Sequence, residues 1–198
     1  EYNNPLTLEG LPLSDKIQAA FFQSVTTRTA GFASLPQENL KNPTAILSLL
    51  LMFIGGSPVG TAGGIKTVTA AVLLSITVSM ISGKNSVSLF GRTISKQAVY
   101  KAVAVTVMSF SVMFVSTLLL SAVTNAPALD ILFETVSATA TVGLSRSLTG
   151  TLNLLGKIII IFTMYFGRVG PISMAIAFGG KNPSRNIIKN PTEEISIG

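Results

Sequence analysis

The stretch ALDILFETVSATATVGL, residues 128–144, decides how this chain folds. Its first part, Ala128 to Thr139, follows Pro127 and is apolar enough to enter a membrane but too short to cross one as a helix. A Thr-rich segment comes next and ends at Gly143. Segments of this kind are typically buried or re-entrant, so we expect a half-helix followed by an irregular turn at membrane depth.

The same arrangement occurs a second time, about 112 residues earlier. The half-span Ser14 to Thr27 runs into SVTTRTAGF at 24–32, and sliding the chain on itself aligns the two segments without a gap. Thr matches arise easily by chance in Thr-rich sequence, so the two Gly pairs and the shared hydropathy plan carry most of the weight. The repeated unit is a short helix, a Gly-containing turn and a broken membrane helix. The matching pairs are Phe21 and Phe133, Thr27 and Thr139, Thr29 and Thr141, Gly31 and Gly143, Met52 and Met164, and Gly55 and Gly167.

Three longer, mainly apolar stretches are predicted to cross the membrane. Ala102–Val123 has no charge over about 22 residues, and an apolar run extends from Leu152 to Gly167; both are near the roughly 20 residues that a spanning helix needs. The crossings are placed at Ala98–Thr124 and Leu152–Phe178. Thr44–Ser82 is too long for one crossing, since at 1.5 Å per residue it would reach roughly 58 Å, nearly twice the hydrocarbon thickness of roughly 30 Å. The run GGSPVGTAGG at 55–64 predicts the break, because Gly lowers helix preference and Pro removes a backbone donor. A comparable interruption of the last span is expected at Gly167, Gly170 and Pro171.

The composition agrees with a membrane protein. The 198-residue chain has 48% hydrophobic and only 11% charged residues, whereas soluble domains have roughly 25% charged residues. The net charge of +6 comes from thinly spread cations and not from one basic face, which excludes a nucleic-acid binder. The sequence has no Cys and no His, which excludes Cys/His zinc sites and catalysis by a thiolate or a His base. No carboxylate pair is placed for acid/base work, so no enzyme activity is expected.

The distribution of charge predicts the orientation. Gly83–Lys101 and the tail after Gly179 both carry basic residues, so the positive-inside rule places both in the cytoplasm. The acidic start of the chain lacks the pattern of a signal peptide and resembles an interior, extracellular piece of a longer protein. We therefore expect an all-α integral protein of the plasma membrane with three crossings and two half-helices. Its predicted parts are a first unit at 1–82, a basic linker at 83–97, a second unit with its outer helix at 98–178 and a cytoplasmic tail at 179–198.

The repeated unit has the features of a cation pathway. A short helix that stops at mid-membrane points the negative end of its dipole inward, which favours a cation there. The segment after it is able to present backbone carbonyls to a dehydrated ion, as the TVGYG loops of potassium channels do. Thr141-Val142-Gly143 reproduces the first three letters of that signature between a half-span and a full span.

The segments TTRTAGF, MFIGGSPVGTAGGIKT, SATATVGLS and FGRVGPISM resemble the Ktr/Trk/HKT superfamily of potassium transporters, and its Ktr membrane subunits most of all. The resemblance implies a potassium-channel-like architecture of four repeats, each with a span, a pore helix, a filter segment and a second span. This chain is similar to the C-terminal part, from the third pore helix to the end of the fourth repeat. The resemblance also implies uptake of K+, with Na+ as a further ion. The partners it implies are the remaining repeats of the transporter, a second copy in a homodimer and a cytoplasmic ring of nucleotide-binding regulatory subunits.

By the same resemblance, backbone carbonyls of the two turns would ligate K+ as filter walls, and the Gly-rich loop would gate the pore from below. One Gly in each wall implies a looser filter than the GYG of channels. The third wall is expected at Arg28, Thr29, Ala30 and Gly31, and the fourth at Ala140, Thr141, Val142 and Gly143. The gate is expected at Gly55, Gly56, Ser57, Pro58, Val59, Gly60, Thr61, Ala62, Gly63 and Gly64, together with Arg168.

Several of these residues have structural alternatives. A guanidinium facing the pore would repel the permeant ion, so for Arg28 we favour a structural clamp with Glu134 over ion contact. For Arg168, pairing with loop carbonyls is as well supported as a role in gating. For Gly167 and Gly170, the alternative to a break in the helix is that they allow close helix packing. At the level of function, the alternatives are a Na+- or H+-coupled carrier with broken helices and a non-transporting membrane scaffold.

Overall fold

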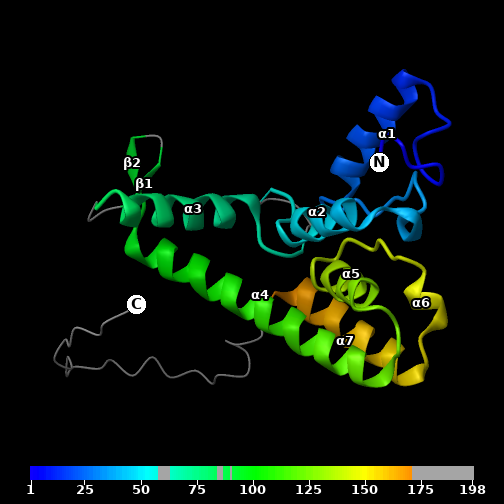
Figure 1. The fold of residues 1–198 in the computed structure, drawn as a ribbon. Coiled ribbons are helices and arrows are strands. Elements are labelled where there is room, and N and C mark those ends of the chain that lie inside the picture. Colours follow the sequence, from blue (N-terminus) through cyan, green and yellow to red (C-terminus); the bar gives the residue numbers. More distant parts are fainter. Residues whose placement is uncertain (58–62, 84–86, 90, 171–198) are drawn as a thin grey trace.

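The protein is described by a computed structural model, in which the chain is mostly helical (Figure 1). The description covers residues 1–57, 63–83, 87–89 and 91–170. A two-stranded antiparallel hairpin, β1 with β2, separates two groups of helices. The elements are α1 (Leu13–Thr26), the 3-10 helix η1 (Gln37–Asn39), α2 (Asn42–Phe53), α3 (Thr67–Ile81), β1 (Ser88–Leu89), β2 (Arg92–Thr93), α4 (Lys96–Val123), α5 (Ala128–Thr139), α6 (Leu148–Thr151) and α7 (Leu154–Val169).

The predicted break in the long apolar stretch is confirmed. Helix α2 ends at Phe53 and α3 begins at Thr67, with the Gly-rich loop between them. The two helices contain 12 and 15 residues, so each is shorter than a membrane span. Among the described residues, α4 is the one helix that is both long and apolar enough to cross, with 28 residues.

The predicted interruption of the last helix is found at Gly170, but Gly167 does not interrupt it. Helix α7 continues through Gly167 to Val169 and ends with Gly170 at positive φ (86°) as its C-cap. A lone Gly costs a helix only about 1 kcal/mol relative to Ala, whereas the paired Gly55-Gly56 followed by Pro58 ends α2. The predicted interruption at Pro171, the end of the last span and the cytoplasmic tail lie outside the described residues.

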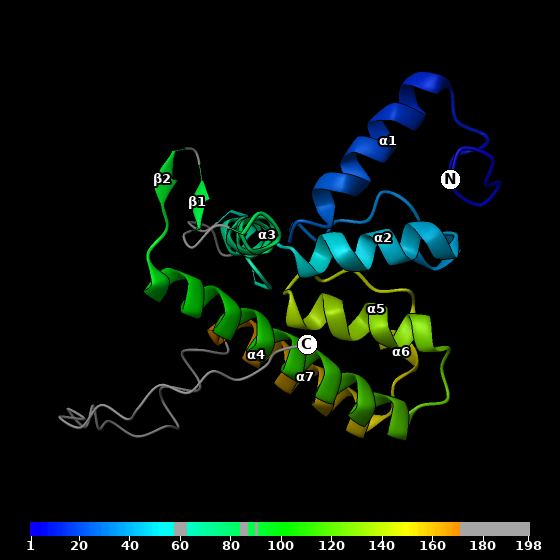
Figure 2. The same cartoon turned by 60° about the vertical axis from the view of Figure 1, so that its left-hand side comes forward.

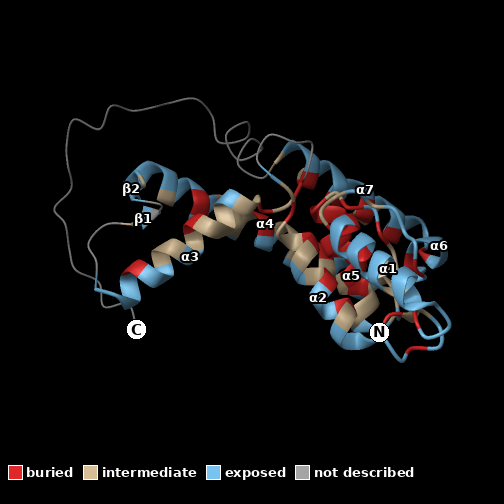
Figure 3. Cartoon of the chain, turned by 90° about the horizontal axis from the view of Figure 1, so that it is seen from above, coloured by how far each residue is buried: buried red, intermediate tan, exposed pale blue. Residues whose placement is uncertain are grey.

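Helix α5 forms the centre of the packed part. It contacts α2 on one side and α4 and α7 on the other, and α4 and α7 lie alongside each other (Figure 2). Every residue from Phe133 to Ala140 is buried, and the buried residues of the chain gather around this helix (Figure 3). Two apolar clusters flank it, one around Met52 and Phe133 and the other around Leu120 and Ile131. The segment that precedes Gly143 is therefore held on several sides.

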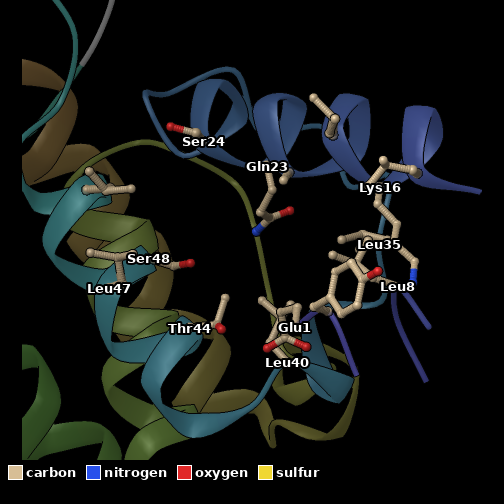
Figure 4. Close-up of a pocket in the computed structure, with 15 residues that line it drawn as sticks. Glu1, Leu8, Lys16, Gln23, Ser24, Leu35, Leu40, Thr44, Leu47 and Ser48 are labelled. Atoms are coloured by element: carbon tan, nitrogen blue, oxygen red, sulfur yellow. The ribbon is translucent and has the colours of Figure 1, made fainter. Parts of the chain in front are cut away.

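Helix α1 has the same place in the repeat but a different environment. Its apolar side chains are largely exposed, including Phe21 at 72% and Ile17 at 63%. A cavity of about 470 Å³ lies between α1 and α2 and is lined mainly by apolar side chains, and the Gln23 side chain points from α1 into this space (Figure 4). Lys16 closes part of this space, with its ammonium 4.1 Å from the centre of the Tyr2 ring. Among the described helices, none covers α1 in the way that α4 covers α5.

The segment before α1 is tied to the start of α2 by the Glu1 side chain. Its carboxylate accepts hydrogen bonds from the side chains of Asn4 and Thr7 and from the backbone N–H of Lys41. Partial burial raises the pKa of Glu1, but these hydrogen bonds outweigh it and lower the pKa to about 2. The carboxylate is therefore ionised at neutral pH and anchors the segment.

Candidate functional site

The two Thr-rich turns adopt the same unusual backbone. Thr29 and Thr141 both have positive φ, at 68° and 55°, and so do Gly31 and Gly143, at 77° and 90°. Positive φ is rare for a β-branched residue, so its recurrence at positions 112 apart is specific. The repeat seen in the sequence is therefore also a repeat of backbone conformation.

Each turn is fastened to the end of the helix before it. After α1, the N–H groups of Ala30 and Gly31 donate to the Thr26 carbonyl, at 3.1 and 3.2 Å. After α5, the Val142 N–H donates to the Ser137 carbonyl at 2.9 Å and the Gly143 N–H donates to Ser137 Oγ at 3.1 Å. The turns thus reverse the chain directly at the negative ends of the two helix dipoles.

The two turns lie directly against each other. An ideal Cβ placed on Gly31 would be 2.1 Å from the Val142 carbonyl oxygen, closer than real Cβ atoms approach other atoms. Gly31 is therefore required both by its φ and by the space around it. At Gly143 only φ is restrictive, since nothing lies within 4 Å of a Cβ there.

The described ends of the Gly-rich loop pack beneath both turns. Ile54 and Ile65 form a parallel bridge that brings the two ends of the loop together. The Gly63 N–H donates to Thr141 Oγ1 at 2.9 Å, and a Cβ on Gly63 would be 2.8 Å from the Ala140 carbonyl oxygen. On the other side, a Cβ on Gly55 would be 3.6 Å from the Thr29 methyl group. The loop end at Gly63 therefore touches a predicted filter residue. Of the predicted gate residues in the loop, the structure describes Gly55, Gly56, Ser57, Gly63 and Gly64. The other five, Pro58, Val59, Gly60, Thr61 and Ala62, lie outside the described residues.

Comparison with known proteins identifies the family. Residues 4–190 match the TrkH family, described as cation transport protein. The chain belongs to this family. The predicted resemblance to Ktr/Trk potassium transporters is thereby confirmed, and with it a place in a membrane transporter.

Two curated TrkH-family relatives are similar to the chain over nearly its full length. The chain is 41% identical to the Ktr system potassium uptake protein B of Bacillus subtilis (strain 168) over 198 residues, which are 100% of this chain and 44% of the relative. It is 38% identical to the potassium/sodium uptake protein NtpJ of Enterococcus hirae over 200 residues, covering 98% of this chain and 44% of the relative. The chain therefore spans less than half the length of these proteins.

A solved structure has the same fold. The crystal structure of the potassium transporter TrkH from Vibrio parahaemolyticus superimposes with a TM-score of 0.74 at 21% sequence identity. The match covers 89% of this chain and 39% of that structure. At this level of identity the likeness concerns the arrangement of the helices.

One prediction about the TrkH-family site is wrong, namely the pairing of Arg28 with Glu134. Arg28 Nη1 instead donates to the carbonyls of Ile54 and Gly55, at 3.2 and 3.4 Å, where α2 ends. The last carbonyls of a helix lack partners and carry partial negative charge, so they satisfy a guanidinium without a carboxylate. Glu134 accepts hydrogen bonds from Ser145 Oγ, at 2.7 Å, and from Thr149 Oγ1. Each side chain therefore supports the turn of its own unit.

The close-packing alternative applies to Gly167. A Cβ on this residue would be 2.2 Å from the Thr139 carbonyl oxygen, so α7 approaches the end of α5 as closely as a Gly allows. Arg168 follows in the last turn of α7 and is exposed. Gly167 thus lies against the end of α5, just before the second turn, and its repeat partner Gly55 lies against Thr29 of the first turn.

Sequence reasoning missed a polar network that joins α1, η1 and the start of α5. Gln23 and Gln37 are buried and exchange two hydrogen bonds through their side-chain amides, at 2.7 and 3.1 Å. Arg146 forms an ion pair with Asp130, with 2.7 Å between Nε and Oδ1. The available signal was the rarity of charge in the second unit, which makes any Arg and Asp there candidates for pairing.

Proposed function

We propose that this chain forms two walls of a potassium pathway, in which backbone carbonyls of the turns 28–31 and 140–143 replace the hydration shell of K+. The observation that carries the proposal is the shared positive-φ backbone at Thr29, Gly31, Thr141 and Gly143, each turn following the negative end of a short helix. Family membership supports a cation, and the potassium named in the curated relatives supports the ion. Because the chain spans less than half of those relatives, uptake is proposed for the complete transporter in the plasma membrane.

The geometry favours a pathway over a proton-coupled carrier. Such a carrier would need a titratable acid at the substrate site, and Glu134 on α5 is a candidate for this role. Glu134 is 5% exposed, and its two oxygens are occupied by Ser145 and Thr149 behind the second turn. The carboxylate is therefore engaged in supporting the turn and does not face a substrate.

Replacing Gly143 by Ser tests the ion assignment. Nothing obstructs a side chain there, but a non-Gly residue at φ +90° costs roughly 1–3 kcal/mol and shifts the neighbouring carbonyls. We expect the preference for K+ over Na+ to fall by roughly tenfold while the protein still reaches the membrane. Uptake of both ions by the complete transporter, in a bacterial strain without its own potassium uptake, is the measurement.

The matched control for this experiment is Gly150→Ser. Gly150 also has nothing within 4 Å of a Cβ but has no positive φ. This variant should keep the wild-type ion preference. A non-transporting scaffold would show the same result for both variants, and an unchanged ratio in Gly143→Ser would refute the carbonyl filter.

We further propose that the loop 55–64 gates this pathway from below. The support is the hydrogen bond from the Gly63 N–H to Thr141 Oγ1, which joins the loop to a proposed filter residue. Glycines let the loop move at low cost, and Arg168 at the end of α7 would add an electrostatic barrier to a cation. Displacement of the loop would then open the pathway.

Thr141→Val tests the gate, because Val keeps the shape of Thr but removes the acceptor for Gly63. A neutral hydrogen bond contributes about 1 kcal/mol, so we expect basal K+ uptake to rise about fivefold. Thr141→Ser keeps the hydroxyl and should behave as wild type. Equal basal uptake in the Val and Ser variants would contradict a closed state held by this bond.

The partners are proposed from the same family. The hairpin β1–β2 and the start of α4 carry exposed Arg92, Lys96 and Lys101, and they suit docking of a cytoplasmic regulatory subunit that binds a nucleotide. The basic tail, the second proposed docking surface, lies outside the described residues. Dimerisation with a second copy completes the proposed assembly.

A further inference from the structure

Arg146 joins the two repeat units close to the turns. It lies three residues after Gly143, and only 9% of its side chain is exposed. Its Nε donates to Asp130 Oδ1 at 2.7 Å, within the second unit. Its other nitrogens donate to carbonyls of the first unit: Nη1 to Gln37 at 2.9 Å and to Leu40 at 3.3 Å, and Nη2 to Glu38 at 3.2 Å.

These contacts form a continuous chain of bonds between the two short helices. Asp130 belongs to the first turn of α5, and Arg146 connects it to Gln37 in η1. The Gln37 side chain is bonded in both directions to Gln23, which lies on α1. Gln23 and Gln37 are buried, at 8% and 2% exposure, so water does not readily replace these bonds. Within this chain of bonds, Arg146 is the side chain that bridges the unit of α5 to the unit of α1.

The geometry requires an Arg. A guanidinium offers donors in a planar fork and reaches a carboxylate and three carbonyls at once, whereas the three donors of a Lys ammonium sit on one atom. Asp130 balances the charge, so the site holds a cation without presenting a net positive charge to the ion path. The guanidinium carbon is also 6.0 Å from the centre of the buried Phe133 ring, which limits its movement.

The first repeat unit has no arginine at the position equivalent to Arg146. The repeat places Ser34 at the position equivalent to Arg146, and Ser34 is exposed. The bridging side chain between the two units therefore comes from the second unit. Carbonyl spacing is the property by which a filter distinguishes alkali ions in the snug-fit account.

We propose that Arg146 is a positioning residue for ion selectivity, which sets the distance between the two turns by bridging Asp130 on α5 to the segment 37–40. The proposal rests on the proposed function, because it assumes that the turns bind the permeant ion. Arg146 itself does not contact the ion. Its removal would leave the turns intact but would allow their separation to vary.

The experiment compares Arg146→Gln, Arg146→Lys and Asp130→Asn in the complete transporter, with Lys157→Gln as the control. Lys157 is an exposed cation of the same unit, so its variant removes one charge without touching the network. The readouts are KM and maximal rate for K+ and for Na+, per amount of transporter in the membrane. We expect the K+/Na+ preference to fall about tenfold in Arg146→Gln and Arg146→Lys, which corresponds to roughly 1.4 kcal/mol, with a smaller change in the maximal rate for K+. Asp130→Asn should have a smaller effect on the preference, and Lys157→Gln none.

Three outcomes would overturn the proposal. A wild-type K+/Na+ preference in Arg146→Lys would mean that a positive charge is sufficient and that the planar guanidinium is not required. A lowered rate or membrane content with an unchanged preference would mean that Arg146 is merely structural. If Arg146→Gln does not reach the membrane, Asp130→Asn decides, because it keeps the shape and a wild-type preference there refutes the proposal. A wild type without K+ preference would instead refute the proposed function.

Discussion

Gly31→Ala is expected to abolish K+-selective uptake by the complete transporter. The added methyl group would be 2.1 Å from the Val142 carbonyl oxygen, and φ at this position is +77°. The obstacle is backbone of the opposite turn, which cannot rotate away as a side chain would, so both turns must shift. Because the proposed ligands are the carbonyls of these turns, we expect K+ uptake to fall by about a hundredfold or more.

The contrast with two other glycines makes this prediction specific. Gly10→Ala in the first unit has open space and no positive φ, so uptake should stay at the wild-type level. Gly143→Ser, which meets the φ restriction but no collision, should lose selectivity and keep uptake. If Gly31→Ala transports as well as Gly10→Ala, the two turns do not adjoin in the working protein.

Gly167→Ala should destabilise the protein even though Ala is the better helix former. Inside α7 the replacement gains roughly 1 kcal/mol in helix propensity. The new Cβ would lie 2.2 Å from the Thr139 carbonyl oxygen, and overpacking against atoms that cannot move typically costs roughly 1–3 kcal/mol. Against backbone we expect the upper end of this range, hence a net loss of about 2 kcal/mol and a lower thermal unfolding temperature of the purified transporter.

Gly156→Ala is the matched control within the same helix. The nearest atoms to its Cβ would be the side chains of Leu152, Asn153 and Leu120, at 3.1 to 3.4 Å. Side-chain ends move by a few tenths of an ångström at low cost, so thermal stability should be unchanged or slightly increased. Equal stability of the Gly167 and Gly156 variants would show that α7 does not press on the end of α5.

The local features of the fold were predictable from the sequence. Helix α5 spans Ala128–Thr139 as predicted from Pro127 and the Thr-rich segment after it, and α1 differs from its predicted range by one residue at each end. The break after α2 followed from adjacent glycines and a proline, which act through backbone energetics alone. These predictions depended only on residues that are close together in the sequence.

The partners of the charged side chains were not predictable in the same way. Arg28 bonds to the carbonyls of Ile54 and Gly55, directly after α2, and Arg146 bonds to the carbonyls of Gln37, Glu38 and Leu40. Every residue has a backbone carbonyl, so the sequence does not indicate which carbonyls will accept hydrogen bonds from a guanidinium. An acid such as Glu134 can be recognised in the sequence as a partner for Arg28 and was therefore predicted. The carbonyls at a helix end cannot be recognised in this way.

The hydrogen bond from Gly63 to Thr141 has a thermodynamic consequence for the proposed transporter. The acceptor belongs to Thr141, a proposed wall residue, so the proposed opening of the loop would alter the surroundings of the ion. Linkage is reciprocal: if moving the loop weakens the hold on K+ by some factor, then K+ favours the bonded loop by the same factor. External potassium would thus act as a ligand of its own gate.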